Sequence, residues 1–186
     1  GGFGVNGNSS NLTISNTTAN TNTNDGFSVK GSATNIIFDH CVADGNAPGG
    51  TGTAGDGFSF HDTSTGTIRY SIARNNRKSA VANVNGSSTS VYYNLFSHTT
   101  DGAWGLVGFR MDDGLTTTHS VYNNTIYTAS TGSGVGLELV GASTGSLTIN
   151  ARNNIISGFG VGISKSNTMT LTETNNLLHN NTTPWQ

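Results

Sequence analysis

Residues Thr144–Asn167 read TGSLTINARNNIISGFGVGISKSN and contain the pattern from which the rest of the chain is built. The segment opens with an alternating strand (Leu147, Ile149, Ala151), passes through an Asn pair, an apolar step and a glycine, and ends in a second alternating strand. Period-two alternation turns one face of each strand toward a core and the other toward solvent. The tight Asn-Gly type of reversal that a hairpin needs is missing between the two strands. The segment therefore predicts a solenoid, in which the chain winds around an axis.

The same order of features recurs along the chain, with an Asn-rich turn after each first strand. The expected turn positions are Asn16, His40, Ser71, Asn94, Asn124, Asn154 and Asn176. Asn suits such a turn because it tolerates left-handed backbone and its amide can bond the neighbouring main chain. Stacked Asn amides can also bond one another from rung to rung. The spacing, roughly 22 to 31 residues, predicts about seven rungs.

The second strand of each rung predicts one inward and one outward column of side chains. These strands are expected at Phe27–Lys30, Phe58–His61, Ala82–Asn85, Val107–Arg110, Val135–Leu139 and Val161–Ser164. The expected inward residues are Val29, Phe60, Val84, Phe109, Leu139 and Ile163. The expected outward residues are Lys30, His61, Asn85, Arg110, Val140 and Ser164.

Three rungs are longer than the others because they carry insertions between the Asn turn and the second strand. The insertions are Ala43–Gly55, His98–Gly105 and Tyr127–Gly134. Side loops that stack on one face of a solenoid usually form the walls of a binding surface.

Composition narrows the class of protein. Only 10% of the residues are charged and the formal net charge is -2, which argues against nucleic acid as a partner because phosphate binding needs a basic face. No apolar run is long enough to span a membrane. The single cysteine, Cys41, excludes an internal disulfide and is interpreted as a small core residue. Residues 1–186 are expected to form one β-helix domain, and the half-rungs at both ends favour a module or fragment of a larger chain.

The chain resembles the right-handed parallel β-helix superfamily, whose members include pectate lyases, polygalacturonases and alginate-acting enzymes. The resemblance rests on the rungs YNLFSH, YNNTIYT, RNNIISG and TNNLLHN, and on DGFSV (Asp25–Val29) and GDGFSFHD (Gly55–Asp62). It implies an all-β, right-handed parallel β-helix with an Asn turn ladder and side-loop insertions, located outside the cell or on its surface. The resemblance does not fix an activity, because the superfamily also includes adhesins, phage spikes and scaffold modules.

Candidate functional residues come from the outward column. Equivalent positions on neighbouring rungs of a parallel sheet lie about 4.8 Å apart, so the outward residues should run up one face. Such a strip suits an acidic sugar chain, because cations neutralise uronate carboxylates and carboxylates bond hydroxyls. Trp104 could stack on a sugar ring. The predicted substrate-binding residues are Lys30, Arg77, Asn85, Trp104, Asp112 and Glu138.

The sharpest hypothesis is cleavage of a uronate polysaccharide by β-elimination. This reaction needs a base near the proton beside the carboxylate, and a cation that stabilises the developing charge. His61 or Lys78 is the expected base, and Arg110 or a calcium ion is the expected neutralising group. The superfamily's lyases resemble this arrangement in placing a basic residue beside an Arg or calcium on a parallel sheet.

Calcium is a possible cofactor, and it requires several oxygen ligands. The predicted metal group is Asp44, Asp56 and Asp62. The lyases of the superfamily cluster more Asp residues around a DGF-like turn than this chain does.

Two alternatives remain open at the level of sequence. A hydrolase needs paired carboxylates, and the adjacent Asp112 and Asp113 would have to lie on a turn to act together, because neighbours on a strand point to opposite faces. A non-catalytic solenoid such as an adhesin, surface fibre or scaffold is the other class, and the half-rung ends predict end-to-end homo-assembly into a filament. In that class His61 is a solvated side chain, and Asp25 and Asp56 only make turns.

Overall fold

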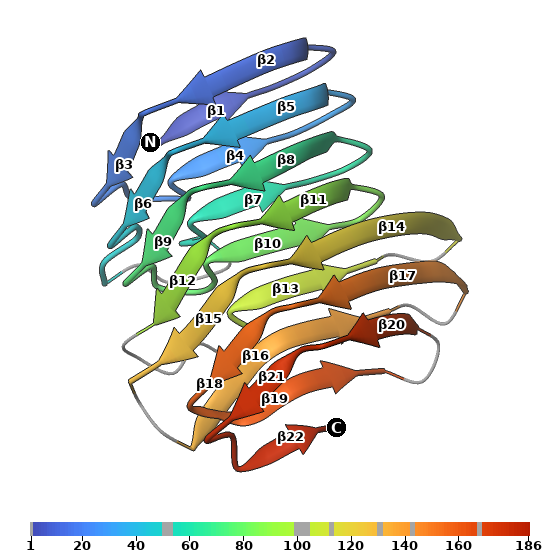
Figure 1. The fold of residues 1–186 in the computed structure, drawn as a ribbon. Coiled ribbons are helices and arrows are strands. Elements are labelled where there is room, and N and C mark those ends of the chain that lie inside the picture. The colour runs from blue at the N-terminus through green and yellow to red at the C-terminus, as the bar shows by residue number, and fades with distance from the viewer. Residues whose placement is uncertain are drawn as a thin grey trace.

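The computed structural model describes residues 2–49, 54–98, 105–111, 114–129, 132–141, 144–166 and 169–186. The chain winds into a solenoid in which each turn adds one strand to each of three sheets (Figure 1). The paired strands are parallel throughout the three sheets. The described residues contain no helix, and hence no helix capable of crossing a membrane. The predicted all-β parallel β-helix is confirmed.

The three sheets are named A, B and C in the order in which the chain enters them. Sheet A contains β1 (Phe3–Val5), β4 (Phe27–Val29), β7 (Phe58–Phe60), β10 (Val81–Val84), β13 (Val107–Arg110), β16 (Ser133–Val140), β19 (Phe159–Lys165) and β22 (Thr183–Trp185). Sheet B contains β2 (Ser10–Ser15), β5 (Thr34–Asp39), β8 (Thr65–Arg69), β11 (Ser88–Tyr92), β14 (Leu115–Tyr122), β17 (Gly145–Arg152) and β20 (Thr170–Thr174). Sheet C contains β3 (Thr18–Asn20), β6 (Val42–Asp44), β9 (Ile72–Arg74), β12 (Leu95–His98), β15 (Thr125–Thr128), β18 (Ile155–Ser157) and β21 (Leu177–His179).

Each turn has three sides, whereas the sequence pattern predicted two strands and an apolar step. The apolar step is itself a short strand, because Ile155 and Ile156 lie in β18 and pair with β15 and β21. The solenoid makes about six turns, slightly fewer than the seven rungs expected, because seven stacked strands are separated by six windings.

The core is a stack of apolar side chains in register from turn to turn. Phe27 of β4 is in register with Phe58 of β7, and the two rings stack with centroids 5.0 Å apart and planes 8° apart. Phe38 of β5 packs against both rings at 5.1 and 5.5 Å. All three are fully buried. Stacked and tilted aromatic pairs of this kind add to the stabilisation that burial of their area provides.

A ladder of buried Asn side chains stabilises the corner between sheets B and C. The Asn124 amide donates from Nδ2 to Val91 O (2.9 Å) and to Asn154 Oδ1 (3.0 Å), and its own Oδ1 accepts from the backbone N–H of Asn94 (3.1 Å). The pattern repeats with Ser71, Asn94, Asn154 and Asn176. Buried backbone groups that the turn would leave unpaired are satisfied in this way.

Two of the predicted ladder positions are wrong by one residue. Asn16 and His40 have positive φ values of 51° and 53° and precede the ladder, in the column that Asn123 and Asn153 occupy later. The ladder position itself holds Thr17 and Cys41 in the first two turns, since Val42 N donates to Thr17 O and Ile72 N to Cys41 O. Each corner therefore uses two residues, one with left-handed backbone and one that bonds along the axis.

A second Asn ladder, which sequence reasoning missed, lies at the corner between sheets C and A. Asn46 donates from Nδ2 to Asn76 Oδ1 (2.7 Å) and to Ala19 O (3.1 Å). Its Oδ1 accepts from the side chain of Asn22 (2.9 Å). Asn46 and Asn76 are buried, and each immediately precedes a segment that leads into sheet A. This ladder fixes the entry to β4, β7 and β10.

The predicted register of β10 is also wrong by one residue. Asn83, not Val84, is in register with inward Phe60 and Phe109, and Asn83 is fully buried. The interior accepts this Asn because its Oδ1 receives a hydrogen bond from Thr89 Oγ1 (3.0 Å). Thr89 in turn contacts Nδ1 of buried His119 (3.0 Å), and burial lowers the pKa of His119 to about 3. A polar cluster therefore interrupts the apolar core at this level.

Candidate functional site

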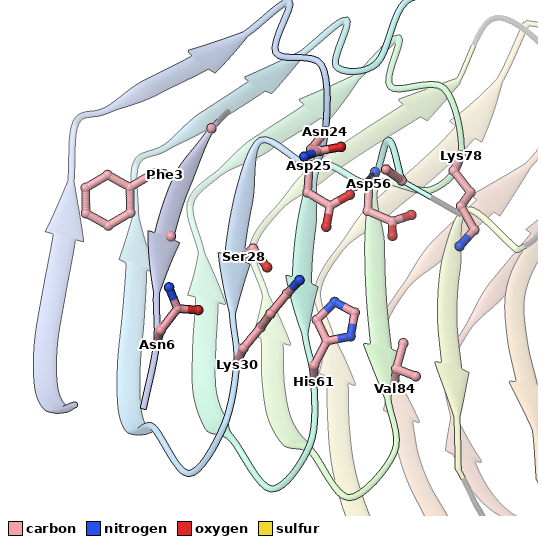
Figure 2. Close-up of a pocket in the computed structure, with 13 residues that line it drawn as sticks. Phe3, Asn6, Asn24, Asp25, Ser28, Lys30, Asp56, His61, Lys78 and Val84 are labelled. Carbon is pink, nitrogen blue, oxygen red and sulfur yellow. Dashed lines mark hydrogen bonds between the residues drawn. The ribbon is translucent and has the colours of Figure 1, made fainter. Parts of the chain in front are cut away.

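A groove of about 540 Å³ follows the outer face of sheet A along the solenoid axis. It crosses four neighbouring strands, β1, β4, β7 and β10. Figure 2 shows that its side chains stand in two rows, with Lys30 and His61 in one and Asp25, Asp56 and Lys78 in the other.

The floor of the groove is formed by small residues in register. Gly4 pairs with Ser28, Ser28 with Ser59, and Ser59 with Ala82. Gly4 and Ser28 line the groove, whereas Ser59 and Ala82 are buried, so the open part of the floor lies over β1 and β4. The hydroxyl of Ser28 is buried and has no hydrogen-bond partner among the described residues.

The first wall is the column that contains Asn6, Lys30, His61 and Val84. His61 N donates to Val29 O and Lys30 N to Val5 O, which puts Lys30 and His61 at equivalent positions of adjacent strands. In Figure 2 the Lys30 side chain extends toward the His61 ring. Burial, and next the Lys30 ammonium, lower the pKa of His61. His61 is therefore a neutral imidazole at neutral pH, and its buried Nε2 has no hydrogen-bond partner among the described residues.

The second wall begins with Asp25, whose carboxylate is fully engaged. Its Oδ1 accepts from the backbone N–H groups of Gly55 (2.9 Å) and Asp56 (3.0 Å), and its Oδ2 accepts from Ser59 Oγ (2.9 Å). Three donors therefore occupy this carboxylate. Asp25 therefore holds the chain just before β7 against the groove.

Asp56 stands beside Asp25 and behaves differently. Its side chain is buried, and its Oδ1 accepts no hydrogen bond from the described residues. Burial, and next the charge of Asp25, raise the pKa of Asp56 to about 7, although Lys78 opposes the shift. Two carboxyl groups so close together cannot both ionise easily, so Asp56 carries a proton over most of the range below neutral pH.

Lys78 completes the second wall from the next turn. It is 8% exposed, and burial lowers its pKa while the Asp56 carboxyl opposes this effect. With Asp56 protonated, the groove holds two ammonium groups, Lys30 and Lys78, against the single carboxylate of Asp25. The groove therefore favours an anionic ligand.

The structure brings together only some of the residues that the sequence predicted for the site. Lys30, Asp56, His61 and Lys78 line the groove. Arg110 and Glu138 lie on sheet A beyond it and form an ion pair (3.1 Å). Asn85 lies past the end of β10, with φ of 64°, because the register of that strand differs from the expected one. Arg77 lies at the corner beside Gly55 and is not part of the groove lining. Trp104 and Asp112 lie outside the described residues.

The three carboxylates predicted to bind calcium occupy three different places. Asp44 is at the end of β6 in sheet C and pairs with Arg74 (2.8 Å). Asp62 follows β7 and accepts from Gly31 N (2.8 Å), whereas Asp56 precedes the same strand. No group of three His, Cys, Asp or Glu residues suited to a metal ion is found in the described parts of the chain.

The residue that sequence reasoning undervalued is Asp25, interpreted as a turn former. A signal was available, because Asp25 and Asp56 both precede a Gly-Phe pair. Once Phe27 and Phe58 are in register, the two Asp side chains must be neighbours. The predicted insertion Ala43–Gly55 does reach the groove, since Ala54 lines it, while residues 50–53 lie outside the described residues.

The outer face of sheet B offers a contrast. It carries two smaller hollows of about 350 and 260 Å³. The smaller is lined only by Asn35, Thr65, Gly66, Thr67, Ser88, Thr89, Ser90, Thr118 and Ser120. None of these side chains can act as an acid or base near neutral pH, so the groove on sheet A is the candidate site.

Comparison with known proteins yields no match to a protein family, to a curated protein or to a solved structure. The case for function therefore rests on the geometry and chemistry of the groove.

Proposed function

We propose that the protein binds an acidic polysaccharide in the groove on sheet A and cleaves it by β-elimination, outside the cell or on its surface. The observation that carries this proposal is His61, a neutral imidazole placed next to Lys30 in a groove that also contains Lys78. A uronate needs both elements, a neutral base for its C5 proton and cations for its carboxylate.

The reaction assigns one role to each wall. His61 takes the proton beside the uronate carboxylate, the electron pair forms the C4–C5 double bond, and the bond from C4 to the glycosidic oxygen breaks. Lys30 and Lys78 stabilise the charge that builds up on the carboxylate. In this proposal protonated Asp56, on the opposite wall, supplies the proton that the departing oxygen needs. The lowered pKa of His61 and the raised pKa of Asp56 match these roles, since base and acid must each be in the correct form at working pH.

This assignment revises the roles expected from the sequence. Lys30 replaces Arg110 as the cation next to His61, because Arg110 is paired with Glu138. Calcium is not required, because the two lysines provide the positive charge. The paired carboxylates Asp25 and Asp56 make a hydrolase the competing enzyme class. Asp25, however, already accepts three hydrogen bonds, which leaves it poorly suited to activate water.

The test is a panel of uronate polysaccharides followed by ultraviolet absorbance. A lyase produces unsaturated ends that absorb, and His61→Ala removes the gain, whereas hydrolysis releases reducing ends without absorbance. Binding measured in parallel by calorimetry separates a binding module from an enzyme. Failure to bind or cleave any member of the panel contradicts the proposal.

A second candidate is a non-catalytic solenoid that assembles end to end. It is favoured by large apolar side chains that are exposed in the first and last turns, including Leu12 at 39%, Leu177 at 55% and Trp185 at 42%. Stacking of two copies would cover these side chains and extend the sheets. Light scattering over a wide concentration range tests this candidate, and a monomer at every concentration contradicts it.

A further inference from the structure

Beyond the groove, a salt bridge between Arg110 and Glu138 crosses the outer face of sheet A from β13 to β16. The floor column continues from Ala82 to Gly108 of β13 and then to Glu138 of β16. The first five positions of this column hold glycine, serine or alanine, and the sixth position holds the longer side chain of Glu138. A ligand that extended along this column beyond β10 would meet the Glu138 side chain.

Glu138 is fixed where it blocks the floor. Its Oε2 accepts from Gly105 N (3.0 Å) and from a terminal nitrogen of Arg110 (3.1 Å). The backbone at Gly105 approaches so closely that a Cβ there would lie 2.4 Å from Cβ of Glu138. The Glu138 side chain is only 17% exposed. The carboxylate is therefore held by backbone and guanidinium together and does not swing away freely.

Arg110 extends the barrier from the floor to the wall. Val84 pairs with Arg110, so Arg110 is the next member of the column that contains Lys30 and His61. Its guanidinium reaches across to Glu138 and closes the gap between wall and floor. The groove lining ends at Val84 and Lys78 of the β10 turn and includes no residue of β13, so Arg110 stands on the next strand beyond it.

At the other end of the groove, the described residues of the floor column are small. The lining at β1 includes Gly2, Gly4 and Asn6, and the floor position there is a glycine. From β1 to β10 the groove spans three strand spacings, about 14 Å, which is the length of a few sugar rings.

We propose that Arg110 and Glu138 form a specificity barrier, so that the groove accepts the terminus of an acidic polysaccharide and excludes its interior. This inference rests on the proposed function, because it concerns the same groove and the same class of ligand. A chain that ran through the groove would have to pass through the salt bridge, whereas a chain that ends at β10 fits. The protein then binds only the end of a polysaccharide, so each polysaccharide chain offers one binding position whatever its length.

The number of binding positions per chain tests the inference without depending on turnover. Calorimetric titration uses the uronate polymer that binds, prepared as fractions of increasing length. The wild-type protein is expected to bind about one copy per chain in every fraction. Glu138→Gly opens the floor, and the number of copies bound per chain should then rise in proportion to length.

Two further variants keep the test interpretable. Glu138→Gln retains the bulk of the barrier without its charge, and it should still bind about one copy per chain. Ser164→Ala changes the next position of the same column, beyond the barrier, and should behave like the wild type. Thermal unfolding shows whether Glu138→Gly is folded, and Glu138→Ala replaces it if it is not.

The outcomes separate the two proposals. One copy per chain for the wild type and a length-dependent number for Glu138→Gly support the barrier. Many copies per chain for the wild type overturn the barrier and leave the proposed function intact. An open variant that still binds one copy per chain also overturns the barrier. Absence of binding to every uronate polymer overturns the proposed function, and the barrier with it.

Discussion

The two halves of sheet A have the same backbone and different chemistry. Strands β1, β4, β7 and β10 carry the groove, while β13, β16, β19 and β22 continue the same parallel ladder without contributing to it. In the first half the floor residues are Gly4, Ser28, Ser59 and Ala82. In the second half the column passes from Gly108 to Glu138 and Ser164. The winding of the chain therefore supplies a scaffold, and the side chains that align on it decide whether a site exists.

The halves also differ in the Asn residues that occupy the corners of sheet C. The Asn ladder between sheets B and C runs from Ser71 through Asn176 and so serves most of the solenoid. The second ladder contains Asn22, Asn46 and Asn76 in the first half. The same corner holds Asn181 in the last turn, where its Nδ2 donates to Ile156 O (2.9 Å) and its Oδ1 accepts from Phe159 N (3.0 Å). In the groove half this ladder lies close to the second wall, because Asn22 precedes Asp25 and Asn76 precedes Lys78 by only a few residues.

The largest expected effect comes from removing the base in the first half. His61→Ala should lower turnover of the uronate substrate by about 100- to 10,000-fold, the usual contribution of a general base. His179→Ala, in the last turn of sheet C, is the matched control and should keep wild-type turnover. Ultraviolet absorbance of the unsaturated product is the measurement. Equal turnover by both variants would remove His61 from the mechanism.

The next effect compares the two ladders. Asn76→Ala and Asn154→Ala each leave buried backbone groups without a hydrogen-bond partner. Each substitution should therefore lower the free energy of unfolding by about 2–4 kcal/mol. Only Asn76→Ala should also weaken substrate binding at temperatures where both variants are folded, because Asn76 lies just before Lys78. Denaturant unfolding and calorimetry measure the two quantities. Equal loss of binding in both variants would contradict the local role of the second ladder.

The pH dependence of stability sharpens the contrast between Asp25 and Asp56. The pKa of Asp56 is about 7 in the folded protein and 3.8 in its ordinary state. Between these values Asp56 binds more protons in the folded state than in the unfolded state, so its contribution to the free energy of unfolding falls as pH rises and is lowest above pH 7. The cost at pH 8 is at most about 4 kcal/mol.

Asp56→Asn removes this cost and should be more stable than the wild type at pH 8, with the difference shrinking toward pH 4. The difference between the two proteins isolates Asp56, because His61 and His119 titrate in both. Thermal unfolding from pH 4 to pH 8 is the measurement. A variant that gains nothing at pH 8 would mean that Asp56 is already ionised without penalty.

The smallest effect concerns a single exposed cation. Lys30→Met should raise KM about tenfold, because one charge-assisted contact to a carboxylate is lost. Lys165→Met, at the end of β19 in the other half of sheet A, is the control and should leave KM unchanged. The effect of Lys30→Met should diminish at high salt, since exposed charges are screened. A KM independent of Lys30 would leave Lys78 as the carboxylate partner.

Sequence reasoning located the fold because alternation is strict in the longest strands. Leu147, Ile149 and Ala151 are buried as expected, and they fix the register of β17 with its neighbours. The reasoning failed where a single position carries the signal. In a doublet such as Asn153–Asn154 the first residue has left-handed backbone and the second joins the ladder, but Asn16 stands alone and the sequence does not say which role it has.

Strand β10 shows a different limit. The segment VANV alternates equally well in either register, and the rule that polar residues face solvent selects the wrong one. The structure places Asn83 inside because Thr89 provides a hydrogen bond there, and Thr89 comes from another sheet. A contact between sheets is not visible in the pattern of one strand.

The site could be predicted in part for a related reason. Lys30 and His61 follow from the outward column, and their neighbourhood needs only the register. Asp56 and Asp62 are close in sequence but lie at opposite ends of β7, because an extended strand separates them. Asp25 and Asp56 are far apart in sequence but adjacent in space. The electrostatic consequence, a protonated Asp56, depends on burial that only the folded chain provides.

The most direct test of the central claim is a crystal structure of the His61→Ala variant with a short uronate oligosaccharide that saturates it in solution. The account predicts sugar rings on the floor formed by Gly4 and Ser28, with a carboxylate within about 3.2 Å of the ammonium group of Lys30 or Lys78. An ordered oligosaccharide bound elsewhere, such as on the hydroxyl-rich outer face of sheet B, with an empty groove on sheet A, would contradict it.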